Sequence, residues 1–129
     1  MLFHYSLTLF YMDQKRQLIY FRNYFWDFFN RQTEKTKDKI DYVLFLVTVS
    51  DKIPGKFFEQ ITGYDGLFAI RIEFESNIYR IFCCFDKGNL VVLFNAFQKK
   101  TQKIPKNEIE KAMRIMDEYN EYKKKEEKK

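Results

Sequence analysis

The chain has 129 residues but only one histidine, His4, and two cysteines, Cys83 and Cys84. A single histidine argues against a zinc site built from imidazole ligands and against Ser-His-Asp chemistry. The two cysteines are neighbours in a predicted strand, so their side chains point to opposite faces and are poorly placed to pair or to bind one metal ion. We therefore expect no metal, no other cofactor and a reducing compartment, the cytoplasm.

The chain also lacks a hydrophobic run long enough to span a membrane. Its first eleven residues are apolar, but they are too few for a span, and they lack the basic start and the small-residue cleavage site of a signal peptide. Because Met12 could itself begin a complete domain, residues 1–12 are interpreted as a leader of uncertain role. The alternative is an added edge strand. No membrane partner is expected.

Aromatic and basic residues are abundant. Fifteen phenylalanines, nine tyrosines and 46% hydrophobic residues suffice for one core, and 129 residues are typical of one domain. The net charge of +5 fits a nucleic-acid partner, although many basic proteins bind no RNA. The local charge is more informative, because residues 98–111 hold five lysines and two glutamates, a net charge of +3.

The second half of the chain contains three runs with strand periodicity, at residues 67–75, 78–85 and 90–98. Short polar breaks separate them, which predicts two consecutive hairpins and hence an antiparallel meander. Arg71 lies on the polar face of the first run. Arg80 lies in an otherwise apolar row of the second run, where an unpaired guanidinium would be costly, so it requires an anionic partner or a cleft.

The third run is apolar on both sides, as expected of a central strand. Strict alternation assigns to one side Val91, Leu93, Asn95, Phe97 and Lys99. Lys99 and Lys100 follow one another at the end of this run, so their side chains are expected to point in opposite directions. Only one of the two lysines can then face a cleft beside the strand directly.

Helices are predicted on either side of these runs. A first strand at 14–21 precedes a short aromatic helix capped by Asn23, and a second helix covers about residues 34–49, so that the two form an antiparallel hairpin. Residues 56–63 are expected to be a packed loop or a short helix. A closing amphipathic helix starts at Pro105. The rings of the aromatic helix could stack on bases, but packing against the sheet is the favoured interpretation.

Four segments carry a recognisable pattern. They are Asp65-Gly66-Leu67, Ile70-Arg71-Ile72, Asn77-Ile78-Tyr79-Arg80-Ile81-Phe82 and Phe97-Gln98-Lys99-Lys100-Thr101-Gln102-Lys103-Ile104-Pro105. Together they resemble the HigB-like, or phage Gp49-like, toxins of the RelE superfamily. The resemblance implies an α+β, RelE-like fold, with an antiparallel sheet of about four strands packed against an N-terminal helical hairpin and a C-terminal helix. It places one toxin domain at 13–122, followed by a charged flexible tail at 123–129.

The resemblance also implies a function. Such toxins belong to type II toxin–antitoxin pairs, cleave messenger RNA, typically on the ribosome, and are silenced by a cognate antitoxin, here expected to be a helix-turn-helix (HigA-like) protein. RNA carries its own nucleophile, the 2′-hydroxyl, so alignment and charge stabilisation can cleave it without a metal. The predicted sheet has no histidine, which excludes the His-assisted variant of this chemistry and leaves the general acid and base open.

Eight residues are candidates for the site. Arg71 and Arg80 are assigned as a phosphate clamp, because an arginine fork can hold two phosphate oxygens. Lys99 or Lys100 is assigned to proton transfer or to stabilisation of the leaving oxygen. The candidates for RNA binding are Gln98, Lys103, Tyr79 and Lys106.

Structural roles compete with two of these assignments. Glu73 lies two residues from Arg71 on the same strand face, so an ion pair is the alternative for this arginine, although Glu73 could also act as a base. Tyr79 is adjacent to Arg80 and therefore points the other way, so core packing is its favoured role.

Two other functions fit the same residues. A non-catalytic RNA- or ribosome-binding module would use the cations only to hold phosphates. A phage-derived protein-interaction domain would use the basic surface to bind an acidic partner, such as an antitoxin segment.

Overall fold

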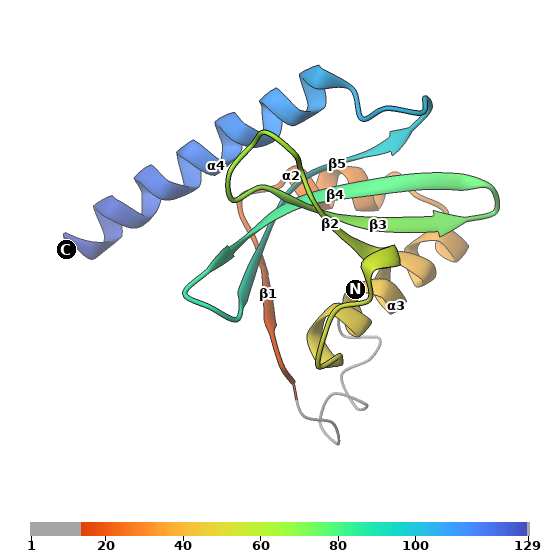
Figure 1. Ribbon diagram of the computed structural model, residues 1–129, viewed down its shortest axis with the longest axis horizontal. Coiled ribbons are helices and arrows are strands. Elements are labelled where there is room, and N and C mark those ends of the chain that lie inside the picture. Colours follow the sequence, from red (N-terminus) through yellow and green to blue (C-terminus); the bar gives the residue numbers. More distant parts are fainter. Residues whose placement is uncertain (1–13, 129) are drawn as a thin grey trace.

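The computed structural model describes residues 14–128 (Figure 1). The predicted leader, residues 1–12, lies outside the described residues. The elements follow in the order β1 (Gln17–Tyr20), α2 (Tyr24–Asn30), α3 (Glu34–Val49), the 3-10 helix η2 (Gly55–Phe57), β2 (Phe58–Gln60), β3 (Phe68–Phe74), β4 (Asn77–Asp86), β5 (Leu90–Lys99) and α4 (Lys106–Glu127).

The strands form one sheet in the order β1-β5-β4-β3-β2. β1 pairs with β5 in parallel, and the other pairs are antiparallel, including the predicted meander β3-β4-β5. The α+β, RelE-like fold class is therefore confirmed, with five strands where about four were expected. The added strand is β2, which comes from the segment 56–63 and pairs with β3. Three residues are too few for period-two alternation to be visible in a sequence.

The sheet is covered on both faces. Figure 1 shows α4 on one side of the sheet and α3 on the other. One hydrophobic cluster joins the α2–α3 side to the sheet and contains Phe25, Phe28, Phe29, Ile40, Val43, Leu44, Val47, Ile70, Ile72, Tyr79, Ile81, Cys83, Val91 and Leu93. A second cluster joins α4 to the other face and contains Phe21, Ile61, Leu67, Ala69, Phe82, Cys84, Val92, Phe94, Ala112, Ile115 and Tyr119. Burial on both faces explains why β4 and β5 are apolar almost throughout.

β5 contains a β-bulge in its middle. The register shifts between Ile81 and Cys83, so that two residues of β5, Phe94 and Asn95, lie opposite the single residue Phe82 of β4. The additional residue breaks the alternation of side chains between the two faces of the sheet.

Beyond the bulge, the odd-numbered side chains of β5 lie on the α4 face. Leu93 packs on the α2–α3 side, whereas Phe97 stacks on Phe82 in the cluster under α4, with ring centroids 5.6 Å apart. Phe97 lies opposite Arg80, and Lys99 follows two residues later on the same face as Phe97. The prediction of one continuous side from Val91 to Lys99 is therefore wrong, because it assumed an unbroken period of two.

α4 begins after Pro105, as predicted, and continues to Glu127. The Asp86 carboxylate anchors its second half, because it accepts hydrogen bonds from the Tyr119 hydroxyl at 2.5 Å and the Lys123 ammonium at 2.7 Å. Residues 123–127, expected in a flexible tail, are helical here. Of the helices in residues 14–128, none is both long enough and apolar enough to cross a membrane.

The two helices on the other face begin after polar residues, only one of which caps its helix through the side chain. Thr33 caps α3, where its hydroxyl accepts a hydrogen bond from the Thr36 backbone N–H at 3.2 Å. α2 begins after Asn23, as predicted, but this side chain makes no capping hydrogen bond. Instead, the Asn23 carbonyl accepts from the Asp27 N–H at 2.8 Å, which starts the helical ladder.

Candidate nucleic-acid interface

Three cations lie on the α4 face of the sheet, one from each of three adjacent strands. Arg71 of β3 is directly opposite Arg80 of β4. Lys99 of β5 is diagonal to Arg80, because Phe97 is the residue opposite that arginine. Diagonal neighbours on one face of an antiparallel pair are roughly 7–8 Å apart. We refer to Arg71, Arg80 and Lys99 as the cationic row.

Each arginine of the cationic row has its own carboxylate. The Arg80 Nε–H donates to Glu59 of β2 at 2.7 Å, so of the two alternatives predicted for Arg80, an anionic partner or a cleft, the anionic partner is present. Arg71 pairs with Glu73 two residues along β3, so the ion pair considered for this arginine is present. Two guanidinium groups directly opposite one another repel, and the two carboxylates offset that repulsion.

Arg80 is almost completely buried. Its side chain is 5% exposed, against 31% for Arg71. The Nη1 atom of Arg80 is buried and has no hydrogen-bond partner among residues 14–128. A buried donor without a partner costs about 1–3 kcal/mol, more when the group is charged, so an anion that reached this nitrogen would remove the cost.

Further lysines follow Lys99 at the end of β5. Lys99 is half-buried, whereas the loop and the start of α4 expose three more predicted residues, Lys100, Lys103 and Lys106. The Thr101 hydroxyl donates to the Lys103 carbonyl at 2.7 Å and so holds the loop. These side chains give the end of the sheet a positive rim.

Two predicted RNA-binding residues lie on the other face. Gln98 is opposite Tyr79, and its amide donates to Asn77 at 2.9 Å. Tyr79 is 4% exposed and packs edge-on against Phe28, with ring centroids 5.9 Å apart. The buried ring has no face for a base, so the RNA-binding assignment of Tyr79 is corrected to core packing.

A polar link joins β5 to the first turn of α4. Asn95 is 2% exposed, and its amide nitrogen donates to the Glu108 carbonyl at 3.3 Å and to the Glu108 carboxylate at 3.4 Å. The Asn95 Oδ1 atom is buried and has no partner in the described part of the chain. The link fixes the start of α4, and with it Lys106, beside the end of β5.

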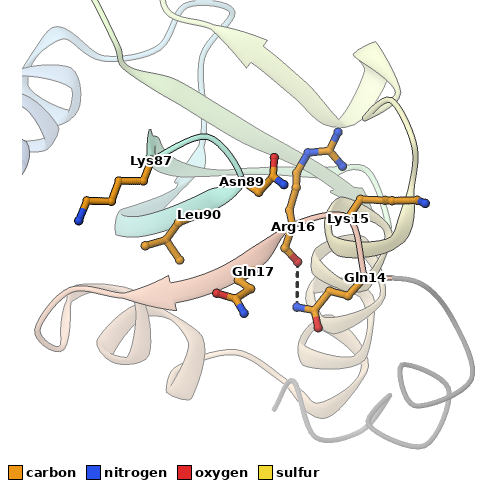
Figure 2. Close-up of a pocket in the computed structure, with 7 residues that line it drawn as sticks. All are labelled: Gln14, Lys15, Arg16, Gln17, Lys87, Asn89 and Leu90. Atoms are coloured by element: carbon orange, nitrogen blue, oxygen red, sulfur yellow. Dashed lines mark hydrogen bonds between the residues drawn. The ribbon is translucent and has the colours of Figure 1, made fainter.

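Another basic pocket, shown in Figure 2, lies at the opposite end of the sheet. It is lined by Gln14, Lys15, Arg16, Gln17, Lys87, Asn89 and Leu90. Arg16 has a structural role there, because its guanidinium donates to the carbonyl of Val47 in the last turn of α3 and to those of Ser50 and Asp51 just after it. Leu90 begins β5 and Lys99 ends it, so this pocket is separate from the cationic row.

The comparison with protein families identifies the family of this chain. A model of the phage-derived protein Gp49-like family (DUF891) matches residues 27–117, which is 91 of the 129 residues. The chain belongs to the Gp49-like family. This is the family of RelE/HigB-like toxins, so the resemblance seen in the sequence is confirmed. No curated protein matches the chain at a significant level.

Membership of the Gp49-like family indicates a toxin of a toxin–antitoxin pair, and with it an antitoxin as partner. The matched residues include the cationic row, its two carboxylate partners Glu59 and Glu73, and the lysines that follow β5. In the described residues of this Gp49-like chain, no three His, Cys, Asp or Glu side chains form a group that could hold a metal ion.

Glu59 and Asn95 were not among the residues predicted for the site. Glu59 lies in β2, which is too short for its periodicity to be visible, so nothing in the sequence connects it with Arg80. Asn95 had a signal, because it is a polar residue within a run that is apolar on both sides and therefore needs a partner. That partner, Glu108, could not be identified without the position of α4.

The two thiols of the Gp49-like chain are poor nucleophiles. Burial raises the pKa of Cys83 well above its ordinary value, and the neighbouring Cys84 adds to the effect. Burial, with a smaller contribution from Asp86, raises the pKa of Cys84 to about 11. Both groups are therefore neutral at pH 7, and neither can serve as a thiolate nucleophile.

Proposed function

We propose that this Gp49-like toxin is an endoribonuclease that cleaves messenger RNA on the ribosome and is silenced by a cognate helix-turn-helix antitoxin. The observation that carries the proposal is the cationic row, in which three adjacent strands each place one cation on the same face. Cations fixed on a rigid sheet suit the binding of a phosphate in a defined orientation.

The row would act on the phosphate that is cleaved. The 2′-hydroxyl oxygen forms a bond to phosphorus, the bond from phosphorus to the 5′-oxygen breaks, and a 2′,3′-cyclic phosphate results. Arg71 and Arg80 would stabilise the negative charge that develops on the phosphate oxygens. Lys99 would protonate the leaving 5′-oxygen, and Glu73 is the nearby carboxylate that could accept the 2′-hydroxyl proton. This chemistry needs no metal bound to the toxin itself.

A non-catalytic RNA- or ribosome-binding toxin is the second candidate. It is favoured by the ion pairs, because both arginines already have a carboxylate partner. Under this alternative the toxin would bind RNA and arrest translation without a cleaved product.

The test compares the wild type with the double variant Lys99→Ala/Lys100→Ala. Both lysines are at least partly exposed, so the fold should tolerate their loss. The control is Lys35→Ala/Lys52→Ala, which removes the same charge from exposed positions away from the cationic row. The chains are induced in cells, and messenger RNA 5′ ends are mapped with and without an inhibitor of translation.

We expect the wild type and the control to arrest growth and to create new 5′ ends that disappear when translation is blocked. The Lys99→Ala/Lys100→Ala variant should create none. A folded wild type that arrests growth without new ends would leave only the binding candidate. New ends that persist in the Lys99→Ala/Lys100→Ala variant would remove these lysines from the catalytic assignment.

A further inference from the structure

A pocket that adjoins the cationic row lies at the edge of β3. It has a volume of about 330 Å³ and is lined by Lys39 and Tyr42 of α3, Lys56 and Phe57 of η2, and Arg71 and Glu73 of β3. We refer to it as the edge pocket. Its volume is at the lower end of the range for small-molecule sites, about 300–1,000 Å³, so it has room for one small unit of a ligand.

The edge pocket exists because β2 is shorter than β3. β2 pairs with β3 only from Phe68 to Ile70, so the outer edge of residues 71–74 has no partner strand within residues 14–128. Arg71 therefore lies at an open edge, where its side chain also lines a pocket with residues of α3 and η2. The same arginine belongs to the cationic row, so the pocket and the row adjoin.

The lining combines cations with aromatic rings. The Lys39 ammonium lies 5.5 Å from the Tyr42 ring centroid, and the Lys56 ammonium lies 4.9 Å from the Phe57 ring centroid. Three cations against one carboxylate, Glu73, leave a net charge of +2. The Tyr42 side chain is among the exposed aromatic residues, at 41%.

A nucleotide matches both features, because its phosphate pairs with Lys and Arg while its base stacks on an aromatic ring. An acidic peptide would use the cations but not the rings. We infer that the edge pocket holds one nucleotide of the RNA next to the phosphate bound by the cationic row. The inference rests on the proposed function, and it extends the RNA-binding surface by one nucleotide beyond the phosphate that is cleaved.

The test measures binding of a single-stranded 2′-O-methyl oligoribonucleotide, which lacks the 2′-hydroxyl nucleophile and cannot be cleaved by the proposed reaction. Fluorescence anisotropy is recorded with the purified full chain at several salt concentrations. The variants are Lys39→Ala/Lys56→Ala, Tyr42→Leu and the conservative Tyr42→Phe. The double variant Lys35→Ala/Lys52→Ala is the control, because it removes the same charge without touching the pocket lining.

We expect Lys39→Ala/Lys56→Ala to bind about tenfold more weakly and to lower the salt slope by roughly 1.4, which is 0.7 for each of two phosphate contacts. Tyr42→Leu should also weaken binding about tenfold through lost stacking, whereas Tyr42→Phe keeps the ring and the affinity. The control should bind within about twofold of the wild type, with a nearly unchanged slope. A wild type that does not bind, or pocket variants that bind as tightly as the control, would overturn the inference.

The outcome is separable from that of the cleavage proposal. If the wild type cleaves unmodified RNA and the pocket variants bind and cleave as it does, the inference falls and the proposed cleavage stands. If the pocket variants lose RNA binding while the wild type cleaves nothing, the pocket stands and catalysis falls. If they keep RNA binding but no longer bind a poly-glutamate peptide, the pocket belongs to a protein partner, which also overturns the inference.

Discussion

The two arginines of the cationic row have different surroundings, so they should differ in their contribution to stability. Arg80 is 5% exposed at its side chain and relies on Glu59, whereas Arg71 and Glu73 are 31% and 56% exposed. A buried guanidinium that loses its carboxylate cannot be compensated by water, but a partly exposed one can. Arg80 therefore combines a structural role with the proposed contact to phosphate, and Arg71 is the more accessible cation.

Glu59→Gln should destabilise the protein by about 1.5–3 kcal/mol, because it weakens a charged hydrogen bond to a buried group. Glu73→Gln is the matched control, and an ion pair this exposed is expected to contribute at most about 1 kcal/mol. Urea unfolding at pH 7, followed by circular dichroism, measures both. Equal losses in the two variants would contradict the distinction between the arginines.

Asp86 is an acidic residue whose titration should be visible in the stability of the fold. Burial alone raises the pKa of Asp86, but hydrogen bonds from Lys123 and Tyr119 outweigh it, so the pKa lies below its ordinary value. A group with a lowered pKa in the folded state contributes stability above its unfolded pKa and loses it as the pH falls through the folded pKa.

Asp86→Asn should therefore be less stable than the wild type at pH 7, with a difference that shrinks as the pH falls below about 4. Urea unfolding at a series of pH values checks this. Asp117→Asn, at an exposed position of α4, is the control and should follow the wild type. A difference between Asp86→Asn and wild type that stays constant down to about pH 2 would show that the carboxylate charge is not what stabilises the link.

At the scale of elements, long regular segments were predictable and short or irregular ones were not. The periodicity of residues 34–49 and of the three runs between 67 and 98 covers several turns or alternations, which is enough to identify α3 and β3–β5. β2 has three residues, so its pattern was invisible. The bulge at Phe94 and Asn95 adds one residue that no local pattern shows, because the residues on both faces of β5 are apolar.

The same limits apply to the candidate site. The importance of Arg71, Arg80 and Lys99 followed from the sequence, but the face on which Lys99 lies depends on the bulge. Glu59 reaches Arg80 across β3, a contact between residues 21 apart in the chain that only the sheet topology reveals. Neighbouring residues of a strand point to opposite faces, so the sequence already placed Tyr79 on the face opposite Arg80. This is why core packing was the favoured role of the Tyr79 ring.

The second half of α4 should depend on the hydroxyl of Tyr119. Tyr119→Phe keeps the ring that packs edge-on against Phe21 at 5.3 Å but removes the hydrogen bond to Asp86. We expect a loss of about 1 kcal/mol and faster amide hydrogen exchange in residues 119–127. Tyr122→Phe is the control, because that side chain is 48% exposed. Unchanged exchange in Tyr119→Phe would mean that packing alone holds the helix.

At the scale of the whole molecule, one sheet separates two hydrophobic cores. The neighbouring residues Cys83 and Cys84 of β4 lie in different cores, so the reactivity of each thiol measures the opening of its own core. Cys83 belongs to the cluster under α2 and α3, and Cys84 belongs to the cluster under α4. The first core is closed by two helices, whereas the second is covered largely by one helix. Detachment of α4 would expose Cys84 and leave Cys83 buried.

Thiol labelling of the native protein should therefore be faster at Cys84 than at Cys83. The single-cysteine variants Cys83→Ala and Cys84→Ala, treated with a thiol reagent in low concentrations of urea, separate the two rates. Both rates should lie far below that of an unfolded thiol, since burial raises both pKa values. If α4 opens alone, the Cys84 rate will depend weakly on urea and the Cys83 rate strongly, because global unfolding exposes more surface. Equal rates with equal urea dependence would instead mean that both cores open in one cooperative step.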